Sequence, residues 1–113
     1  NGTISEGTGD NIFIVKNGKV YTPPPIAAIL VGITRGITIQ LAREEGIEVI
    51  EREITVHELI TADESFMTGT AAEIASLVEV DGKKIGNGTP GPVTLRLIHK
   101  FKEIRKTGTP VYR

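Results

Sequence analysis

The chain has 113 residues, of which 39% are hydrophobic and 24% charged, and its formal net charge is -1. This length holds one domain with a single core, and the composition excludes an intrinsically disordered segment. Aromatic residues make up 4% and there is no Trp, while basic residues are interspersed with acidic ones, so we expect no nucleic-acid partner and no membrane partner. The absence of cysteine excludes disulfides and thiolate metal sites and predicts a cytoplasmic location.

The first residues carry no targeting signal. Residues 1–6 lack an initiator Met, a basic segment and an apolar segment, and no apolar run in the chain approaches the length of a membrane span. We therefore expect residues 1–113 to be a single domain cut from a longer protein.

The first predicted elements form a hairpin. Residues 12–15 are a β-prone run, Asn17-Gly18 is typical of a two-residue turn, and residues 19–22 form the return strand. Three prolines at 23–25 prevent further pairing.

A helix is predicted next, starting near Gly32 and ending at Glu45. Ile33, Ile37 and Leu41 recur at helical spacing, and Gly46 supplies a left-handed stop. Residues 47–50 then indicate a strand.

A capping box, Thr55 with Glu58, predicts a short second helix. Residues 65–67 indicate a buried strand, which is followed by the small-residue segment 68–72, and residues 74–80 indicate another strand that turns at Asp81-Gly82.

The last helix is predicted to begin with Thr89 as N-cap and Pro90 as its first residue. One face of it carries apolar side chains, and Gly108 follows its end. The apolar residues are Val93, Leu97, Phe101 and Ile104. The order of elements predicts a mixed α/β (α+β) domain.

Three segments contain residues suited to ligand binding. Glu6 precedes two glycines that let a backbone approach a ligand closely. Gly32, Ile33 and Thr34 stand at the expected mouth of a helix, where free N-H groups favour a phosphate. Residues 68–73 follow a buried strand and could present backbone amides to an anion. Taken separately, an acidic surface loop, an ordinary helix start and a tight strand connection are the simpler interpretations.

Taken in order, these segments resemble the fold type IV enzymes that depend on pyridoxal 5'-phosphate (PLP), also called class IV aminotransferases. The strings SEGTGDNIF, TPP, GITR, ADESFMTGTAAE and VDGKKIGNGTPGPVT occur in the order expected of branched-chain amino acid aminotransferases. D-amino acid aminotransferases and aminodeoxychorismate lyases of the same fold share the glutamate and the GITR-like string but usually differ at 68–73 and 91–94. The resemblance implies the C-terminal pseudo-barrel domain of the D-amino acid aminotransferase-like fold.

The resemblance also implies residue roles. Glu6 would contact the pyridine nitrogen of PLP, and Gly32, Ile33 and Thr34 would hold the cofactor phosphate. Thr70 would add a phosphate contact, and Thr70 and Ala71 would face the substrate carboxylate. The reaction would move the amino group of Leu, Ile or Val to 2-oxoglutarate, in a homo-oligomer whose other partners are the amino acid and 2-oxo acid substrates.

Two features depart from the family pattern. Asp10 stands where the family often has Glu. The lysine that forms the Schiff base would lie upstream of Asn1, so no catalytic residue is expected in this chain and residues 1–113 alone should be inactive; Lys16 is no substitute. A lyase, a D-amino acid aminotransferase or a non-catalytic phosphate-binding module are the alternatives.

The remaining polar residues suggest ordinary structural roles. His57 falls within the capping box and His99 on the last helix, and neither has a partner at metal-ligand spacing, so no metal site is expected. Phe66 and Met67 are predicted to be core residues.

Overall fold

The computed structural model describes residues 11–24, 29–68 and 74–107, and only the backbone of residues 29–33 and 105–107. The predicted hairpin is confirmed: β1 (Asn11–Lys16) pairs antiparallel with β2 (Lys19–Thr22), and Val15 lies opposite Val20. Asn17 and Gly18 both have positive φ, 54° and 77°, which is the conformation a two-residue hairpin turn requires. Strand β2 ends immediately before the prolines.

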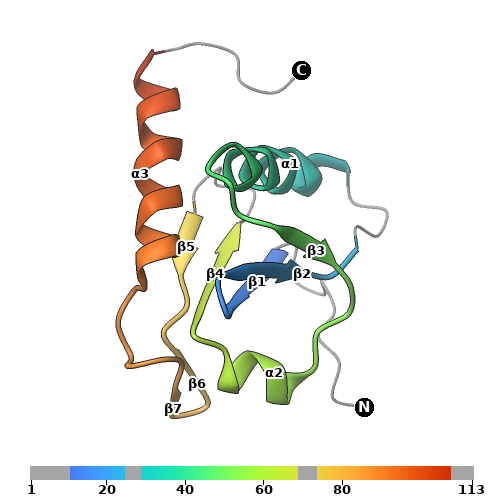
Figure 1. Cartoon of the computed structure of the whole chain (residues 1–113), viewed down its shortest axis with the longest axis vertical. Helices are drawn as coiled ribbons and strands as arrows, with labels where there is room; N and C mark the ends of the chain where they lie inside the picture. Colours follow the sequence, from blue (N-terminus) through green and yellow to red (C-terminus); the bar gives the residue numbers. More distant parts are fainter. Residues whose placement is uncertain (1–10, 25–28, 69–73, 108–113) are drawn as a thin grey trace.

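Five strands form one sheet in the order β3-β2-β1-β4-β5 (Figure 1). Strand β3 (Val49–Glu51) runs parallel to β2, whereas β4 (Glu64–Thr68) and β5 (Ile74–Ser76) extend the sheet in antiparallel fashion. Parallel neighbours need a crossover, and the helix between β2 and β3 provides it. The sheet is therefore mixed, with one β-α-β unit at its β3 side.

The crossover helix, α1 (Ile29–Glu44), begins three residues before the predicted start at Gly32. Gly32 does not have to mark the start of the helix, because a glycine inside a helix costs only about 1 kcal/mol relative to alanine. The helix can therefore begin earlier, after Pro25. At the other end Gly46 has φ 79°, its amide donates to Arg43, and the Ile47 amide donates to Ala42. This pair of bonds is the Schellman closure that the glycine predicted.

That closure explains why β3 starts later than expected. The sequence predicted a strand from Ile47, but the Ile47 amide is held at 2.9 Å from the Ala42 carbonyl as part of the helix end. The chain is free to pair only from Val49 onward.

Two apolar clusters hold the layers together. In Figure 1 the sheet lies between α1 above and α2 (Val56–Thr61) below, and α3 (Pro92–Thr107) stands along its β5 side. The rings of Phe13 and Phe66 stack at 4.8 Å inside the cluster that faces α1 and α3. Ile14 and Leu59 belong to the second cluster, on the α2 side. The alternation along β1 thus gives each face of the sheet its own core.

The predicted strand 74–80 is divided in two. Strand β5 stops at Ser76, and β6 (Glu79–Val80) instead pairs with β7 (Lys83–Lys84) in a separate hairpin. Leu77 and Val80 pack against the α2-side cluster, which draws the chain away from the main sheet. The turn at Asp81-Gly82 is confirmed by φ values of 50° and 78°.

The predicted start of α3 is wrong. The helix begins at Pro92, and Thr89 lies outside it, in a turn where its amide and hydroxyl both donate to Asn87. The Gly91 carbonyl accepts the first helical bond, from Leu95, and the capping side chain is Glu64, from β4. A buried remote carboxylate thus replaces the local threonine.

The predicted inner face of α3 is confirmed, because Leu97 and Phe101 are buried and Val93 and Ile104 pack against the same cluster. Phe66 is a core residue as predicted, whereas Met67 is only half-buried. The predicted stop, Gly108, lies outside the described residues.

Candidate functional site

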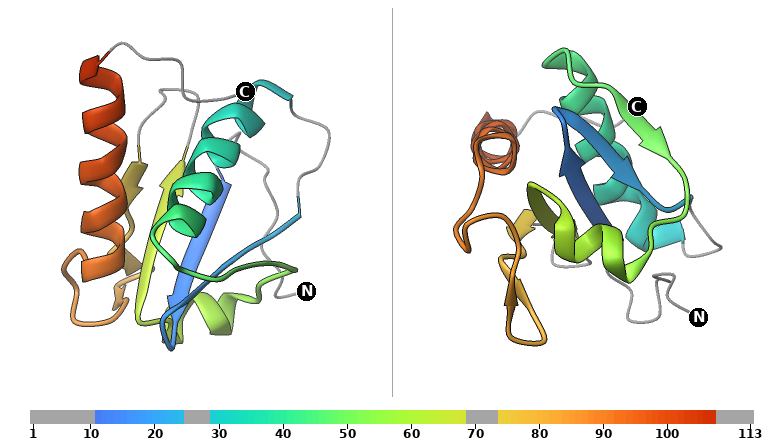
Figure 2. Two further views of the ribbon diagram at one scale, coloured as in Figure 1. Left: turned by 45° about the horizontal axis from the view of Figure 1, so that its top comes forward. Right: turned by 60° about the horizontal axis from the view of Figure 1, so that its bottom comes forward.

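One end of the sheet adjoins all three segments that the sequence marks for ligand binding. Asn11, the first residue of β1, pairs with Thr68, the last residue of β4. The Thr22 hydroxyl donates to the Ile12 carbonyl at 2.9 Å, so β2 also ends there. We call the end formed by Asn11, Thr22 and Thr68 the site end; it is the upper end of the sheet in the left view of Figure 2. Residues 1–10 precede it in sequence, and residues 69–73 follow it.

Helix α1 brings the third segment toward the same end. In β-α-β units the crossover helix starts beyond the carboxyl end of the first strand, where such folds bind anions. The first turns of α1 lie toward the site end in Figure 2. Gly32 and Ile33 are in this part of the helix, and Thr34 is buried, with its carbonyl accepting from the Thr38 hydroxyl at 2.8 Å.

The early start of α1 corrects one detail of the prediction. In a helix that begins at Ile29 the free N-H groups belong to the first turn. The amides of Ile33 and Thr34 lie one turn further on. Amides of the second turn are positioned to bond to carbonyls four residues earlier, so they are not free N-H groups. The helix mouth predicted at Gly32 is therefore at Ile29.

Arg35 is a buried charge that none of the sequence motifs indicated. It is 6% exposed, and its Nη2 donates to the Pro23 carbonyl and to the Glu51 carboxylate, each at 3.0 Å. A signal was available: Arg35, Thr38 and Ala42 are spaced as one face of a helix, and all three are buried.

Thr68, at the end of β4, is the first residue of the segment 68–73 that the sequence marked for ligand binding. It is fully buried, and its hydroxyl oxygen has no hydrogen-bond partner in the described part of the chain. Buried polar groups are almost always paired, so a hydroxyl that finds no partner within the described residues, beside a suspected site, fits a bound polar ligand. Its position fits a phosphorylated cofactor at the site end.

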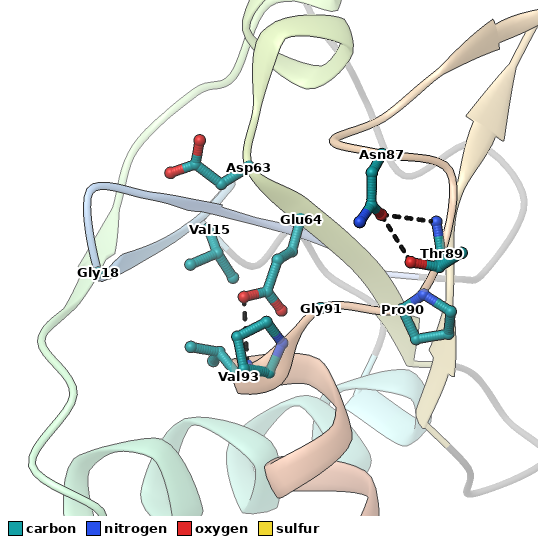
Figure 3. A pocket seen from close by; sticks show the side chains of 10 residues that line it. Val15, Gly18, Asp63, Glu64, Asn87, Thr89, Pro90, Gly91 and Val93 are labelled. Atoms are coloured by element: carbon teal, nitrogen blue, oxygen red, sulfur yellow. Dashed lines mark hydrogen bonds between the residues drawn. The ribbon is translucent and has the colours of Figure 1, made fainter.

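The opposite end of the sheet is occupied by structural contacts. A hollow of about 490 Å³ lies between β4 and the start of α3, and Glu64 points across it (Figure 3). The Glu64 carboxylate accepts from the Val93 amide at 3.2 Å and from the Thr94 amide and hydroxyl at 2.8 Å. A carboxylate engaged in three hydrogen bonds is held in place as a helix cap and is poorly suited to general acid-base work.

The surface pair Arg52 and Glu58 also has a structural role. The guanidinium makes two bonds to the carboxylate, of 2.8 and 3.2 Å, and lies over the Tyr21 ring at 4.7 Å. The bond from Arg52, followed by the Thr55 amide, lowers the pKa of Glu58 to about 2. The same bond raises the pKa of Arg52.

Other candidates for catalysis lie apart from the site end. Lys16 is on the exposed end of β1, where its Nζ donates to the Thr61 carbonyl at 3.0 Å. His57 is exposed on α2, and His99 pairs with Glu103 on α3 at 3.2 Å. Among the described residues no group of three His, Cys, Asp or Glu side chains could hold a metal ion, and no helix is long and apolar enough to cross a membrane.

Comparison with known proteins gives the family. Residues 1–80 match the family model described as amino-transferase class IV. The chain belongs to the class IV aminotransferases. A relative from this family, the branched-chain-amino-acid aminotransferase of Pseudomonas aeruginosa, is 52% identical over 96 residues, which are 85% of this chain and 31% of that protein.

Solved class IV aminotransferases share the fold. The T.th. branched-chain amino acid aminotransferase, complexed with N-(5'-phosphopyridoxyl)-L-glutamate, superposes with a TM-score of 0.85 at 38% identity, covering 96% of this chain and 37% of that one. The Escherichia coli enzyme gives 0.81 at 46% identity, covering 92% and 35%. The predicted mixed α/β fold and family resemblance are confirmed. The chain thus spans between 31% and 37% of the length of these relatives.

Within this class IV domain, the structure locates only part of the predicted site. Gly32, Ile33 and Thr34 lie in α1 near the site end, and of the first two only the backbone is described. Glu6, Thr70 and Ala71 lie outside the described residues. Their assigned contacts remain predictions, supported by the position of the strands that flank them.

Proposed function

We propose that this chain is the cofactor-binding part of a PLP-dependent aminotransferase that moves the amino group of Leu, Ile or Val to 2-oxoglutarate. The observation that carries the proposal is the pairing of Asn11 with Thr68, which makes the segments containing Glu6 and Thr70 leave the sheet from adjacent strands at one end. The names of the relatives supply the substrate class. The homo-oligomer, the cytoplasmic location and the single C-terminal domain remain predictions.

Chain length permits the proposed contacts. Thr70 is two residues beyond Thr68 and Glu6 is five before Asn11, so they reach at most about 7 Å and about 17 Å from the sheet. Both distances are compatible with a single cofactor lying across the site end. The start of α1, which carries Ile33 and Thr34, approaches the same end from the β2 side.

Each residue has a distinct task in this proposal. When bound, PLP supplies an electron-withdrawing ring that accepts charge from the substrate α-carbon. Glu6 holds the proton on the ring nitrogen through a charge-assisted hydrogen bond. Gly32, Ile33 and Thr34 would hold the phosphate beside the first turn of α1, with Thr34 contributing its hydroxyl because its amide is positioned to bond to a carbonyl one turn earlier. Thr70 would add a hydroxyl to the phosphate, and the amides of Thr70 and Ala71 would orient the substrate carboxylate.

The Schiff-base lysine is not among these residues. We propose that it comes from a part of the protein outside residues 1–113, so that this chain positions cofactor and substrate while the lysine moves the proton. Residues 1–113 alone, mixed with PLP, leucine and 2-oxoglutarate, should therefore release no glutamate.

The experiment uses the complete protein that contains these residues. With PLP, leucine and 2-oxoglutarate it should form glutamate and the branched 2-oxo acid, and Glu6→Gln should lower kcat by at least about tenfold because the ring nitrogen loses its charged partner. Glu79→Gln, an exposed carboxylate on β6, is the control. Release of 4-aminobenzoate from aminodeoxychorismate, turnover of D-amino acids, or PLP binding without turnover would each replace the proposal with one of its rivals.

A further inference from the structure

We propose that Arg35 is a positioning residue for the phosphate end of the cofactor site, a role that rests on the function proposed above. Its guanidinium holds the early turns of α1 against the ends of β2 and β3, and so fixes the place at which Ile33 and Thr34 receive the phosphate. Arg35 itself touches neither cofactor nor substrate in this proposal.

The burial of Arg35 is costly and needs a structural or functional explanation. Only 7% of its side chain is exposed, and removing a guanidinium from water is costly unless its partners compensate. Its Nε has no hydrogen-bond partner within the described residues, and its carboxylate partner, Glu51, is itself 42% exposed. Among the described residues the buried guanidinium thus has one half-exposed carboxylate as its ionic partner, and a buried charge of this kind is tolerated where its placement serves a function.

The contacts of Arg35 join three elements at one point. One nitrogen, Nη2, reaches the Pro23 carbonyl just after β2 and the Glu51 carboxylate at the end of β3. These two strand ends are themselves fixed, since Thr22 lies opposite Glu51 in the parallel pair and its carbonyl accepts the Arg52 amide at 2.9 Å. Arg35 thus attaches the helix to the corner of the sheet formed by the ends of β2 and β3, beside the site end.

The attachment by Arg35 also fixes the position of its neighbour in sequence, Thr34. Thr34, the proposed phosphate ligand, directly precedes Arg35 in the same helical turn, and it is buried like Arg35. A helix is stiff over a turn, so the rotation and depth that Arg35 imposes are passed to the Thr34 and Ile33 backbone. Misplacing a ligand-binding group by about 1 Å can cost two orders of magnitude in rate.

The test separates phosphate positioning from general stability by using two probes, PLP and pyridoxal, which differ only in the phosphate. In the complete protein, Arg35→Met should weaken PLP binding by about tenfold or more and leave pyridoxal binding within about twofold. Arg43→Met is the matched control, because Arg43 is exposed in the last turn of the same helix and its loss changes the net charge equally. The Arg43→Met protein should bind PLP and pyridoxal with the affinities of the wild type.

Arg35→Lys covers the case in which Arg35→Met does not fold. Lysine keeps the charge but is strongly hydrated and lacks the planar fork, so PLP binding should fall by about threefold with pyridoxal unaffected. A folded Arg35→Met or Arg35→Lys protein with wild-type affinity for PLP overturns the inference, and so does an equal loss for both probes. A wild-type protein that binds no PLP would instead overturn the proposed function.

Discussion

Glu64 shows how a single side chain joins two distant parts of this sequence. The residue is only 7% exposed, and its carboxylate bonds to Val93 and Thr94, which are 29 and 30 residues away. The first turn of α3 has no capping side chain of its own, since the residues that precede it are Pro90 and Gly91. The helix therefore relies on the strand for its cap.

Removing this cap should be costly. Glu64→Ala leaves two amides and a hydroxyl without an acceptor, and we expect it to lower the free energy of unfolding by about 2 to 3 kcal/mol. Urea denaturation measures the change, with Glu79→Ala as a control that should shift it by less than about 0.5 kcal/mol. A similar, small effect of both substitutions would contradict the assigned cap.

Glu58 should make stability depend on pH. Its pKa in the folded protein is about 2, below the ordinary value of 4.5, so its contribution is complete above pH 4.5 and is lost as the pH falls toward 2. Glu58→Gln should therefore be less stable than the wild type at pH 7, by less than about 1 kcal/mol because the pair is partly exposed to solvent. Thermal unfolding at pH 7, 4 and 2 should show this difference shrinking and then vanishing.

The variant Glu53→Gln is the control for Glu58, as Glu53 is an exposed carboxylate in the segment just before α2. A gap between Glu58→Gln and the wild type that persists unchanged at pH 2 would show that the ion pair is not its cause.

At this scale the sequence predicts interactions between close neighbours well and those between distant residues poorly. The capping box of Thr55 and Glu58 was readable because its partners are three residues apart, and both of its bonds are present. The partners of Glu64 and Arg35 come from other elements, and no local pattern indicates them. Burial of these two charges is decided by tertiary packing.

At the scale of elements, Gly91 sets how closely α3 approaches β4. A Cβ at this position would overlap the carboxyl group of Glu64. Gly91→Ala should therefore cost about 1 to 3 kcal/mol through steric overlap, and much less in a Glu64→Ala background, where the obstructing atoms are gone. A double-mutant cycle in urea measures this coupling, and additive effects would refute the contact.

A contrasting glycine clarifies the physical cause. Gly46 has φ 79° and open space around its Cβ direction, so Gly46→Ala should cost about 1 kcal/mol from backbone strain, independently of Glu64. The two glycines are thus needed for different reasons, one for space and one for conformation.

The end of an element was predicted correctly where the sequence holds a local turn or stop signal. The predicted start was displaced where tertiary contacts determine the first residue of the helix. The hairpin turn at Asn17 and the helix stop at Gly46 were correct because positive φ is a local property. The starts of α1 and α3 were misplaced, by three and two residues respectively. The α3 start depends on Glu64, which the local threonine and proline could not reveal.

At the scale of the whole molecule, the sheet separates two cores of unequal size. The larger one lies beneath α1 and α3, and Leu97 is fully buried in it. Leu97→Ala should lower the free energy of unfolding by about 2 to 5 kcal/mol. Leu95→Ala, on the same helix but 52% exposed, should change it by less than about 0.5 kcal/mol, and comparable losses would contradict the assigned face.

The sequence indicated the mixed α/β class and the family, but the order and direction of the strands in the sheet could not be predicted from it. Parallel pairing of β2 with β3, and β1 at the centre between β2 and β4, depend on contacts between residues far apart in the chain. The three suspected ligand segments were found as separate motifs. Only the pairing of Asn11 with Thr68 shows that two of them adjoin one end of the sheet.

The cap on α3 also has a dynamic consequence. Amides in the first turn of a helix usually exchange their hydrogens with solvent quickly, since they lack acceptors. Those of Val93 and Thr94 are bonded to the carboxylate of a buried strand residue, so we expect deuterium to enter them mainly when β4 and α3 separate. Their exchange rate would therefore report on the undocking of the helix from the sheet, and not on fraying of the helix end.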